Sequence, residues 1–284
     1  MLTALKKALI KYALPNDLRN RVDQAPLKLN SVRYDDWGLD PDVLKATLAA
    51  TIHLYRNYFR VRTIGIDRVP QGRVLLIANH GGQLPFDGML IGVSMLADAN
   101  PPRVVRGMVE RWFPAIPFIS PLFVRCGQMV GDIHNCTDLL NNDQCVLVFP
   151  EGVRGSGKPW SKRYELQRFG TGFVRLALET GTPIVPVGVI GCEETYPTLF
   201  HMNFIGKLFG APYFPITPLF PLLGPLGVLP LPAKVLLNYG EPLRFTGSAD
   251  APDSEIEEKV EIVKAALRKQ VEEGIEARGN RIFL

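Results

Sequence analysis

The sequence predicts an α/β fold in which a mostly parallel central sheet is flanked by helices. Two observations support this prediction. Six short apolar runs rich in β-branched residues are separated by segments long enough to be helices, which is the pattern of strands joined by crossover helices. The chain has 284 residues, of which 46% are hydrophobic and 21% charged. That length can bury one large core, and that composition argues against disorder.

An N-terminal amphipathic helical segment, residues 1–56, is expected to precede an α/β domain at 57–284. The opening residues, 1–15, place their leucines and isoleucine mostly on one helical side and lack the uninterrupted apolar core of a cleaved signal peptide. Residues 1–33 carry seven cationic side chains against two carboxylates, a balance that suits an anionic membrane surface. The alternative is a helix packed on the body with its lysines in water.

Helices and strands follow in a regular order after this segment. A helix is expected over 41–57, because Asp40 is a suitable N-cap and Pro41 suits the first helical position. A long amphipathic helix is expected over 254–277, where apolar residues recur on one face. The remaining expected elements are helix-length segments at 87–98 and 170–180 and strands at 59–66, 73–79, 103–109, 144–150, 182–190 and 233–240.

An apolar, proline-rich loop is expected at 203–233. Leu208 to Ala233 contains seven prolines and no charged residue, and as a helix it would be long enough to cross a bilayer. Proline removes backbone donors and clashes inside a helix, so a transmembrane helix is not expected. The loop either dips into a membrane interface or roofs an acyl-chain pocket. The alternative is a proline-rich connection folded onto the core.

The cysteines and the remaining charges argue against a disulfide framework, a zinc site and a nucleic-acid-binding protein. The four cysteines show no C-x-x-C spacing and mostly lie in or beside apolar runs, which favours reduced thiols in a cytosolic protein. A zinc site from Cys126, His134, Cys136 and Cys145 fits no common ligand spacing, so no metal is expected. Beyond the basic start there is no basic stripe with interleaved aromatics, so nucleic acid is not an expected partner.

The first of two chemical motifs is ANHGGQLPFD, residues 78–87, which directly follows an apolar run. Asn79 and His80 lead into two glycines, which allow a tight turn and close approach of a substrate. The carboxylate of Asp87 is placed to accept the imidazole N–H, fixing the tautomer and raising the basicity of the other ring nitrogen. Such a pair can deprotonate an alcohol. The alternative is that Asp87 caps a helix and His80 is a polar strand end.

The second motif is VFPEGVRGSGK, residues 148–158, at the end of another apolar run. It carries Glu151, Gly152 and Arg154, and a turn with a carboxylate and cations can grip a polar acceptor. Because ligands bind at the carboxyl ends of parallel strands, we expect the two motifs to form one active site. The alternative is an ordinary turn with a solvated basic flank.

The second motif also suggests a rival class of protein, because Gly152 to Lys158 reads G-x-x-x-x-G-K, the start of a P-loop. Pro159 stands where Ser or Thr should bind magnesium, and no second apolar strand ends in a suitable Asp. Nucleotide binding is therefore disfavoured. The chain has no G-x-S-x-G elbow and no cysteine in either motif, so no covalent acyl-enzyme is expected.

Taken together, Asn-His with a downstream Asp and Phe-Pro-Glu-Gly-x-Arg resemble the motifs of the glycerolipid acyltransferases of the lysophosphatidate acyltransferase superfamily. The likeness extends from about Asn57 to Gly247 and includes TPIVPVGVIG and LLNYGEPLRF. In that family the histidine is the general base, the aspartate orients it, and the glutamate and arginine help to bind the acceptor. The resemblance implies that His80 and Asp87 are catalytic. It implies that four further residues bind the substrate, Glu151, Gly152, Arg154 and Asn79.

One departure from the family pattern concerns the spacing of the first motif. The usual spacing has four residues between His and Asp, whereas Pro85 stands at that position here and Asp87 lies two residues further on. This longer loop resembles the monoacylglycerol and diacylglycerol acyltransferase-like branch, which weakens the case for a phosphorylated acceptor. In the family's second motif, which is blurred here, Arg106 or Arg125 is a further candidate for the acceptor site.

The resemblance implies an O-acyltransferase that moves a fatty acyl group from a thioester, acyl-CoA or acyl-carrier protein, to a hydroxyl of a glycerolipid such as lysophosphatidate or another lysophospholipid. It implies a peripheral or monotopic enzyme on the cytoplasmic face of a membrane, with membrane lipids as partners. It implies no cofactor beyond the thioester co-substrate. Acylation of mono- or diacylglycerol and a noncatalytic lipid-binding protein are the alternatives. Backbone N–H groups in the glycine-containing turns are the expected oxyanion donors.

Overall fold

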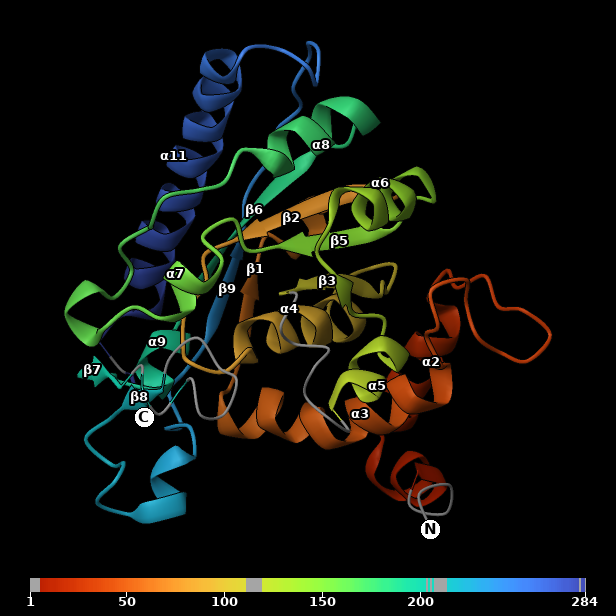
Figure 1. Cartoon of the computed structure of the whole chain (residues 1–284). Helices are drawn as coiled ribbons and strands as arrows, with labels where there is room; N and C mark the ends of the chain where they lie inside the picture. The colour runs from red at the N-terminus through yellow and green to blue at the C-terminus, as the bar shows by residue number, and fades with distance from the viewer. Residues whose placement is uncertain are drawn as a thin grey trace.

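A seven-stranded sheet lies between two layers of helices in the computed structural model (Figure 1). The structure describes residues 6–110, 119–202, 204, 206, 214–280 and 282–283. The strand order is β1-β9-β6-β2-β5-β3-β4, and each neighbouring pair is parallel except β6 with β9. The predicted α/β architecture with a mostly parallel sheet is confirmed.

Each of the six strand segments expected from the sequence contains a strand of the sheet. The additional strand, β4, has only two residues, which is too short to give a periodic pattern. The strands are β1 (Arg62–Ile64), β2 (Val74–Ala78), β3 (Val105–Val109), β4 (Met129–Val130), β5 (Cys145–Val148), β6 (Ile184–Ile190) and β9 (Leu236–Tyr239).

Strand β2 lies in the middle of the sheet, and all five of its residues are buried. Successive side chains of a strand point to opposite faces. Leu76 and Ala78 belong to one apolar cluster of the core, and Leu75 and Ile77 belong to the other. A strand covered on both faces reads as a continuous apolar run, which explains why VLLIA shows no alternation with polar residues.

The helices divide between the two faces, as Figure 1 shows. On one face, α2 (Asn16–Gln24), α3 (Pro41–His53) and α4 (Phe86–Ala97) contribute buried residues to the first cluster. On the other face, α6 (Ile133–Asn141), α8 (Gly172–Thr180) and α11 (Asp253–Arg278) contribute to the second. The remaining short helices are α5 (Ile119–Arg125), α7 (Val153–Ser156) and α9 (Cys192–Thr195).

The described part of the N-terminal segment is helical over residues 6–13, 16–24 and 41–56, as the sequence predicts, and irregular over 25–40. It includes the π-helix η1 (Leu9–Ala13) and α2, and the second π-helix η2 (Leu54–Tyr58) follows α3. Leu14, Leu18 and Val22 are buried in the first core cluster, so this segment packs on the sheet domain. The first five residues of the predicted amphipathic stretch lie outside the described residues. Helix α3 begins as predicted, with Asp40 accepting hydrogen bonds from two backbone N–H groups of its first turn.

The predicted apolar loop at 203–233 is irregular in its described part. A two-stranded antiparallel pair, β7 (Phe200–His201) with β8 (Pro215–Ile216), leads to a short 3-10 turn, η6 (Gly224–Val228). Residues 203, 205 and 207–213 of the loop lie outside the described residues. In the portion of the chain that the structure describes, no helix is both long and apolar enough to span a membrane.

A buried ion pair ties the segment before α3 to the sheet. Arg106 on β3 pairs with Asp35, and both side chains are only 1% exposed. Arg106 also donates to Gln144 Oε1 and lies over the ring of Trp37 at 5.2 Å. Burying two charges is unfavourable unless each remains paired and hydrogen-bonded. Arg106 is therefore a structural residue, and the sequence-based suggestion that it binds the acceptor is wrong.

We predict that Asp35→Asn destabilises the fold by about 3–5 kcal/mol, because it leaves the Arg106 guanidinium buried without its counter-charge. Urea unfolding at pH 7 measures this difference. Glu241→Gln is the matched control, since its ion pair with Arg68 is solvent-exposed and should contribute at most about 1 kcal/mol. Equal losses for the two variants would contradict this account.

Candidate active site

His80 lies directly after β2, beside the carboxyl end of the neighbouring parallel strand β5. Its ring stacks on Phe149, with the two ring centroids 4.3 Å apart and an interplanar angle of 26°. The His80 backbone N–H donates to Glu151 Oε1 at 3.0 Å, so the second motif holds the first in place. The structure thus brings the two sequence motifs to one edge of the sheet.

Asp87 contacts the histidine as predicted, despite the longer spacing. His80 Nδ1 and Asp87 Oδ2 are 2.5 Å apart, and the Asp87 side chain is fully buried. The same carboxylate accepts hydrogen bonds from the backbone N–H groups of Gly81 and Gly88. Because Asp87 lies in the first turn of α4, the positive end of that helix also favours its negative charge. These contacts fix the carboxylate and leave His80 Nε2 as the nitrogen available for proton transfer.

The environment of His80 raises the pKa of its imidazole above the ordinary value. Burial alone would lower this pKa, but the negative charge and hydrogen bond of Asp87, followed by the charge of Glu151, outweigh it. Lys158 opposes the increase. The neutral imidazole, which can accept a proton, therefore becomes the main form only at a pH above this raised pKa.

Glu151 lies beneath the histidine turn rather than in open space. Its side chain is buried, Oε1 accepts from His80 N, and Oε2 accepts from the backbone N–H of Gln167 at 2.7 Å. Lys158 Nζ stands 3.8 Å from Oε2. Both carboxylate oxygens are engaged by the protein, so this geometry favours positioning of His80 over direct contact with an acceptor.

The other predicted binding residues divide into two kinds. Asn79 is fully buried, and its amide donates to and accepts from the backbone of Val189. It therefore joins β2 to β6 and does not reach a substrate, which corrects the sequence-based assignment. Gly152 has φ +55° and makes the turn into α7. Arg154 is exposed, and it donates to the carbonyl of Arg168 at 3.4 Å.

Close packing around the histidine requires glycine at two positions. A Cβ at Gly155 would lie 2.8 Å from His80 Cβ and 2.7 Å from Glu151 Cβ. A Cβ at Gly81 would lie 2.6 Å from Glu193 Cγ. Any side chain there would push the histidine turn away from the segments that hold it.

One charged residue of the site, Glu193, was missed by the sequence analysis, and it contacts Lys158, a cation of the second motif. Lys158 Nζ lies 2.9 Å from Glu193 Oε1 and donates to the carbonyl of Glu165. Burial raises the pKa of the Glu193 carboxyl, although Lys158 opposes this. Glu193 lies shortly after the last residue of β6. The rule that ligands bind at the carboxyl ends of parallel strands, applied to TPIVPVGVI, would therefore have identified Glu193 as a candidate.

A second layer of contacts supports this pair. The backbone N–H of Tyr164 donates to Glu193 Oε2 at 2.8 Å, and the Tyr164 hydroxyl donates to Glu194. Burial and then the charge of Glu194 raise the pKa of Tyr164, so the phenol stays protonated. Arg278, at the end of α11, pairs with Glu194 Oε1 at 2.7 Å. The last helix is thereby linked to the site.

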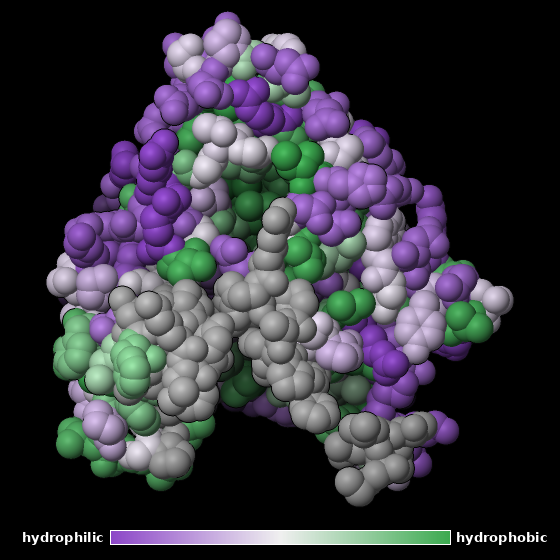
Figure 2. Space-filling view, in the orientation of Figure 1, coloured by the Kyte–Doolittle hydropathy of each residue, from purple (hydrophilic) through white to green (hydrophobic). Residues whose placement is uncertain are grey.

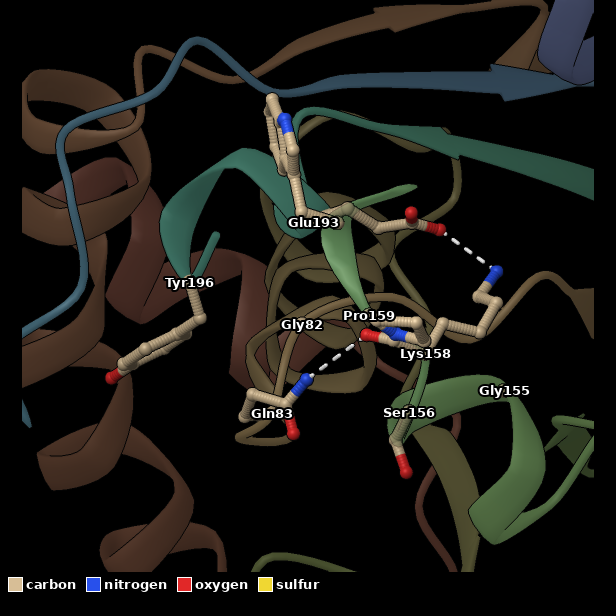
Figure 3. Close-up of a pocket in the computed structure, with 9 residues that line it drawn as sticks. Gly82, Gln83, Gly155, Ser156, Lys158, Pro159, Glu193 and Tyr196 are labelled. Carbon is tan, nitrogen blue, oxygen red and sulfur yellow. Dashed lines mark hydrogen bonds and ion pairs between the residues drawn. The ribbon is translucent and has the colours of Figure 1, made fainter. Parts of the chain in front are cut away.

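A small pocket lies between the histidine turn and these residues, as Figure 3 shows. Glu193 from α9 and Lys158 from the segment after α7 meet at one side of it, and the Gln83 amide reaches toward the carbonyl of Lys158. Tyr196 and Trp160 also line the pocket. Within the described residues, no group of three or more His, Cys, Asp or Glu side chains is arranged to hold a metal ion.

The sequence pattern of the family described as Acyltransferase matches residues 60–190, the stretch that holds both motifs. Across 251 residues, the chain is 38% identical to the uncharacterized protein Rv0502 of Mycobacterium tuberculosis, covering 85% of this chain and 70% of that protein. The chain belongs to the acyltransferase family. The geometry above is therefore that of an acyltransferase.

Two further similarities concern proteins whose names state an activity. The chain is 22% identical to the mouse protein titled "DGAT1/2-independent enzyme synthesizing storage lipids", over 76% of this chain and 61% of that protein. Its fold is similar to the crystal structure of the 1-acyl-sn-glycerophosphate acyltransferase PlsC from Thermotoga maritima, with a TM-score of 0.53 and 19% sequence identity. That match covers 84% of this chain and 83% of the PlsC chain.

We predict that Asp87→Asn lowers the pKa of His80, because burial then acts without the opposing carboxylate. NMR titration of the four histidines measures this, with His80→Ala identifying the signal.

Since the folded pKa of His80 exceeds the unfolded value of about 6.5, the charged pair of His80 and Asp87 stabilises the wild type fully below that pH. This stabilisation is lost as pH rises through the folded pKa.

His201 is the internal control for that titration, because burial alone lowers its pKa. Its midpoint should stay the same in Asp87→Asn. An unchanged His80 midpoint in that variant would show that Asp87 does not control the charge of the imidazole.

Proposed function

We propose that this acyltransferase transfers a fatty acyl group from an acyl thioester to a hydroxyl of a glycerolipid, with His80 as the general base. This proposal rests on the 2.5 Å contact between His80 Nδ1 and the buried Asp87 carboxylate at the carboxyl edge of the sheet. A histidine oriented in this way is suited to remove a hydroxyl proton. The similarity to the Thermotoga 1-acyl-sn-glycerophosphate acyltransferase supports a glycerolipid acceptor, and the similarity to the mouse enzyme synthesizing storage lipids supports a lipid product.

In the proposed reaction, His80 Nε2 accepts the acceptor's hydroxyl proton as that oxygen attacks the thioester carbonyl carbon. The Asp87 carboxylate holds Nδ1–H and stabilises the imidazolium that forms. Backbone N–H groups of the glycine-containing turns stabilise the tetrahedral oxyanion. The intermediate collapses, the carbon–sulfur bond breaks, and the imidazolium returns its proton to the leaving thiolate. The products are an ester and a free thiol, and no acyl-enzyme forms.

The substrate contacts follow from where the residues lie. Arg154 is proposed to meet a polar group at the rim, because its guanidinium is exposed. Glu151 acts through the His80 backbone, because both of its oxygens are already engaged. The donor is proposed to be acyl-CoA or an acyl-carrier protein, since each presents a thioester. No cofactor enters this reaction as proposed.

We predict that His80→Ala lowers kcat/KM for acyl transfer by roughly 10²–10⁴-fold, the usual contribution of a general base. Release of free thiol from palmitoyl-CoA in detergent, with and without a lysophospholipid or monoacylglycerol acceptor, measures the rate. An acyl-carrier protein charged with the same chain tests the other donor. His53→Ala is the matched control, because His53 is the exposed last residue of α3. Full activity of His80→Ala with any donor would refute this mechanism.

The enzyme is further proposed to work at a membrane surface, with membrane lipids as partners. Large apolar side chains are exposed around β7, β8 and η6, and this group is named the apolar projection. Figure 2 shows apolar surface in this region, at the lower left of the view. Its exposed members are Leu199, Phe200, Met202, Phe204, Leu222, Leu223, Leu226 and Leu229. An exposed apolar patch of this kind marks a surface that meets a membrane or another protein.

Figure 1 shows the basic N-terminal segment and the apolar projection toward opposite ends of α3, both on the lower side of the view. Lys6, Lys7, Lys11 and Arg19 line one shallow hollow there. Cations that lie on the same side of a protein as an apolar surface favour a bilayer with anionic headgroups. The cysteines are free thiols, three of them buried, which supports the cytoplasmic side.

We predict that Leu222→Ser combined with Leu226→Ser weakens binding to vesicles of mixed neutral and anionic phospholipid several-fold, because these side chains are 84% and 67% exposed. Vesicle flotation measures the bound fraction, and raising the salt concentration should weaken binding of the wild type. Ile262→Ser, at a side chain 52% exposed on α11, is the control and should bind like the wild type. Identical flotation of all three proteins would exclude the apolar projection as the contact.

A further inference from the structure

The small pocket beside His80 presents one hydrogen-bond acceptor that the protein leaves unpaired and one carboxylate oxygen that is paired with a single cation. Gln83 Oε1 is buried without a hydrogen-bond partner, and Gln83 and Glu193 both line this pocket. Glu193 Oε1 lies 2.9 Å from Lys158 Nζ, and a carboxylate oxygen has a second lone pair that can accept another hydrogen bond. Glu193 is only 7% exposed. Leaving a buried acceptor unpaired costs free energy, so the pocket favours a ligand group that donates hydrogen bonds.

The charges around the pocket are unfavourable for an anion. Glu193 and Glu151 are carboxylates, and Lys158 is the cation between them. The Lys158 ammonium is already engaged by Glu193 and by the carbonyl of Glu165. Two negative charges against one positive charge repel a phosphate, and the repulsion is strong because these groups are removed from water.

The size of the pocket points to the same kind of ligand group. Its volume is about 10 Å³, and a space of this size holds one water-sized group. A hydroxyl fits such a space and can donate to Gln83 or Glu193, whereas a phosphate offers mainly acceptors. The pocket also adjoins the base, because Gly155 lines it and packs against His80.

We propose that this pocket is a subsite for the second, non-reacting hydroxyl of a neutral glyceride, which donates to Gln83 and Glu193 while the first hydroxyl is presented to His80. The proposal rests on the proposed acyl transfer and names its acceptor class. A monoacylglycerol carries the two hydroxyls that this arrangement uses. Lysophosphatidate carries one hydroxyl and a phosphate, and a simple alcohol lacks the second hydroxyl.

Equilibrium binding to full-length His80→Ala protein tests the subsite without turnover. Isothermal titration with 1-octanoylglycerol, 1-octanoylglycerol 3-phosphate and 1-octanol compares ligands of the same chain length. We expect 1-octanoylglycerol to bind roughly tenfold or more tightly than the other two, the fold-change of one well-placed hydrogen bond to a charged group. Adding Gln83→Met should reduce this preference, because methionine keeps the length of the side chain and removes the acceptor oxygen.

Two further variants make the binding test specific. Glu193→Gln removes the charge of the second acceptor and should also reduce the preference for 1-octanoylglycerol. Gln24→Met makes the same chemical change as Gln83→Met at an exposed position of α2 and should leave the preference as it is. Thermal melting of each protein checks that its fold is kept.

Equal or tighter binding of the phosphate or the simple alcohol would overturn the subsite. So would an unchanged preference in both Gln83→Met and Glu193→Gln, because the pocket would then hold a structural water only. Selective binding of 1-octanoylglycerol, with no acyl transfer by the wild type from either class of donor, would keep the subsite and refute the proposed function. His80-dependent transfer to lysophosphatidate without selective binding would keep the proposed function and refute the subsite.

Discussion

The hydrogen bond from the His80 backbone to the buried Glu151 carboxylate joins the two strand ends on which the site is built. Strands β2 and β5 are parallel neighbours, with Ile77 paired to Val148, so their carboxyl ends emerge side by side. The carboxylate also accepts from Gln167, which fixes the segment that leads into α8. A charged acceptor makes these bonds stronger than neutral ones. The position of His80, its contact with Asp87 and the shape of the adjacent pocket all depend on this buried carboxylate.

Two kinds of constraint meet around that carboxylate. The charges of Asp87, Glu151, Lys158 and Glu193 are buried, and each must be compensated within a few ångströms. Close packing is the second constraint, because Gly155 leaves no room for a side chain between His80 and Glu151. The site is therefore rigid by construction, which suits a base that must hold its orientation during proton transfer.

Local patterns were sufficient to predict most of the fold. Runs such as VLLIA and CVLV are β-branched and apolar because they are covered on both faces, so the strands were visible in the sequence. The pairing of His80 with Asp87 was also predictable, since both residues lie in one short loop between a strand and a helix. The role of Asn79 was not, because its partner Val189 lies 110 residues away. The contact between Lys158 and Glu193 was not predictable for the same reason, because it joins separate segments, although the position of Glu193 after β6 could have marked it as a candidate.

The ion pair between Arg278 and Glu194 has a consequence for the order in which the chain matures. Glu194 neighbours Glu193 at the pocket, whereas Arg278 lies at the end of the last helix. A ribosome exposes the two motifs more than a hundred residues before Arg278, since His80 and Glu151 come early in the chain. The nascent protein can form the inner strands first, but the wall of the pocket closes only when the final helix has been released. The complete wall of this pocket is therefore expected only after α11 has been synthesised.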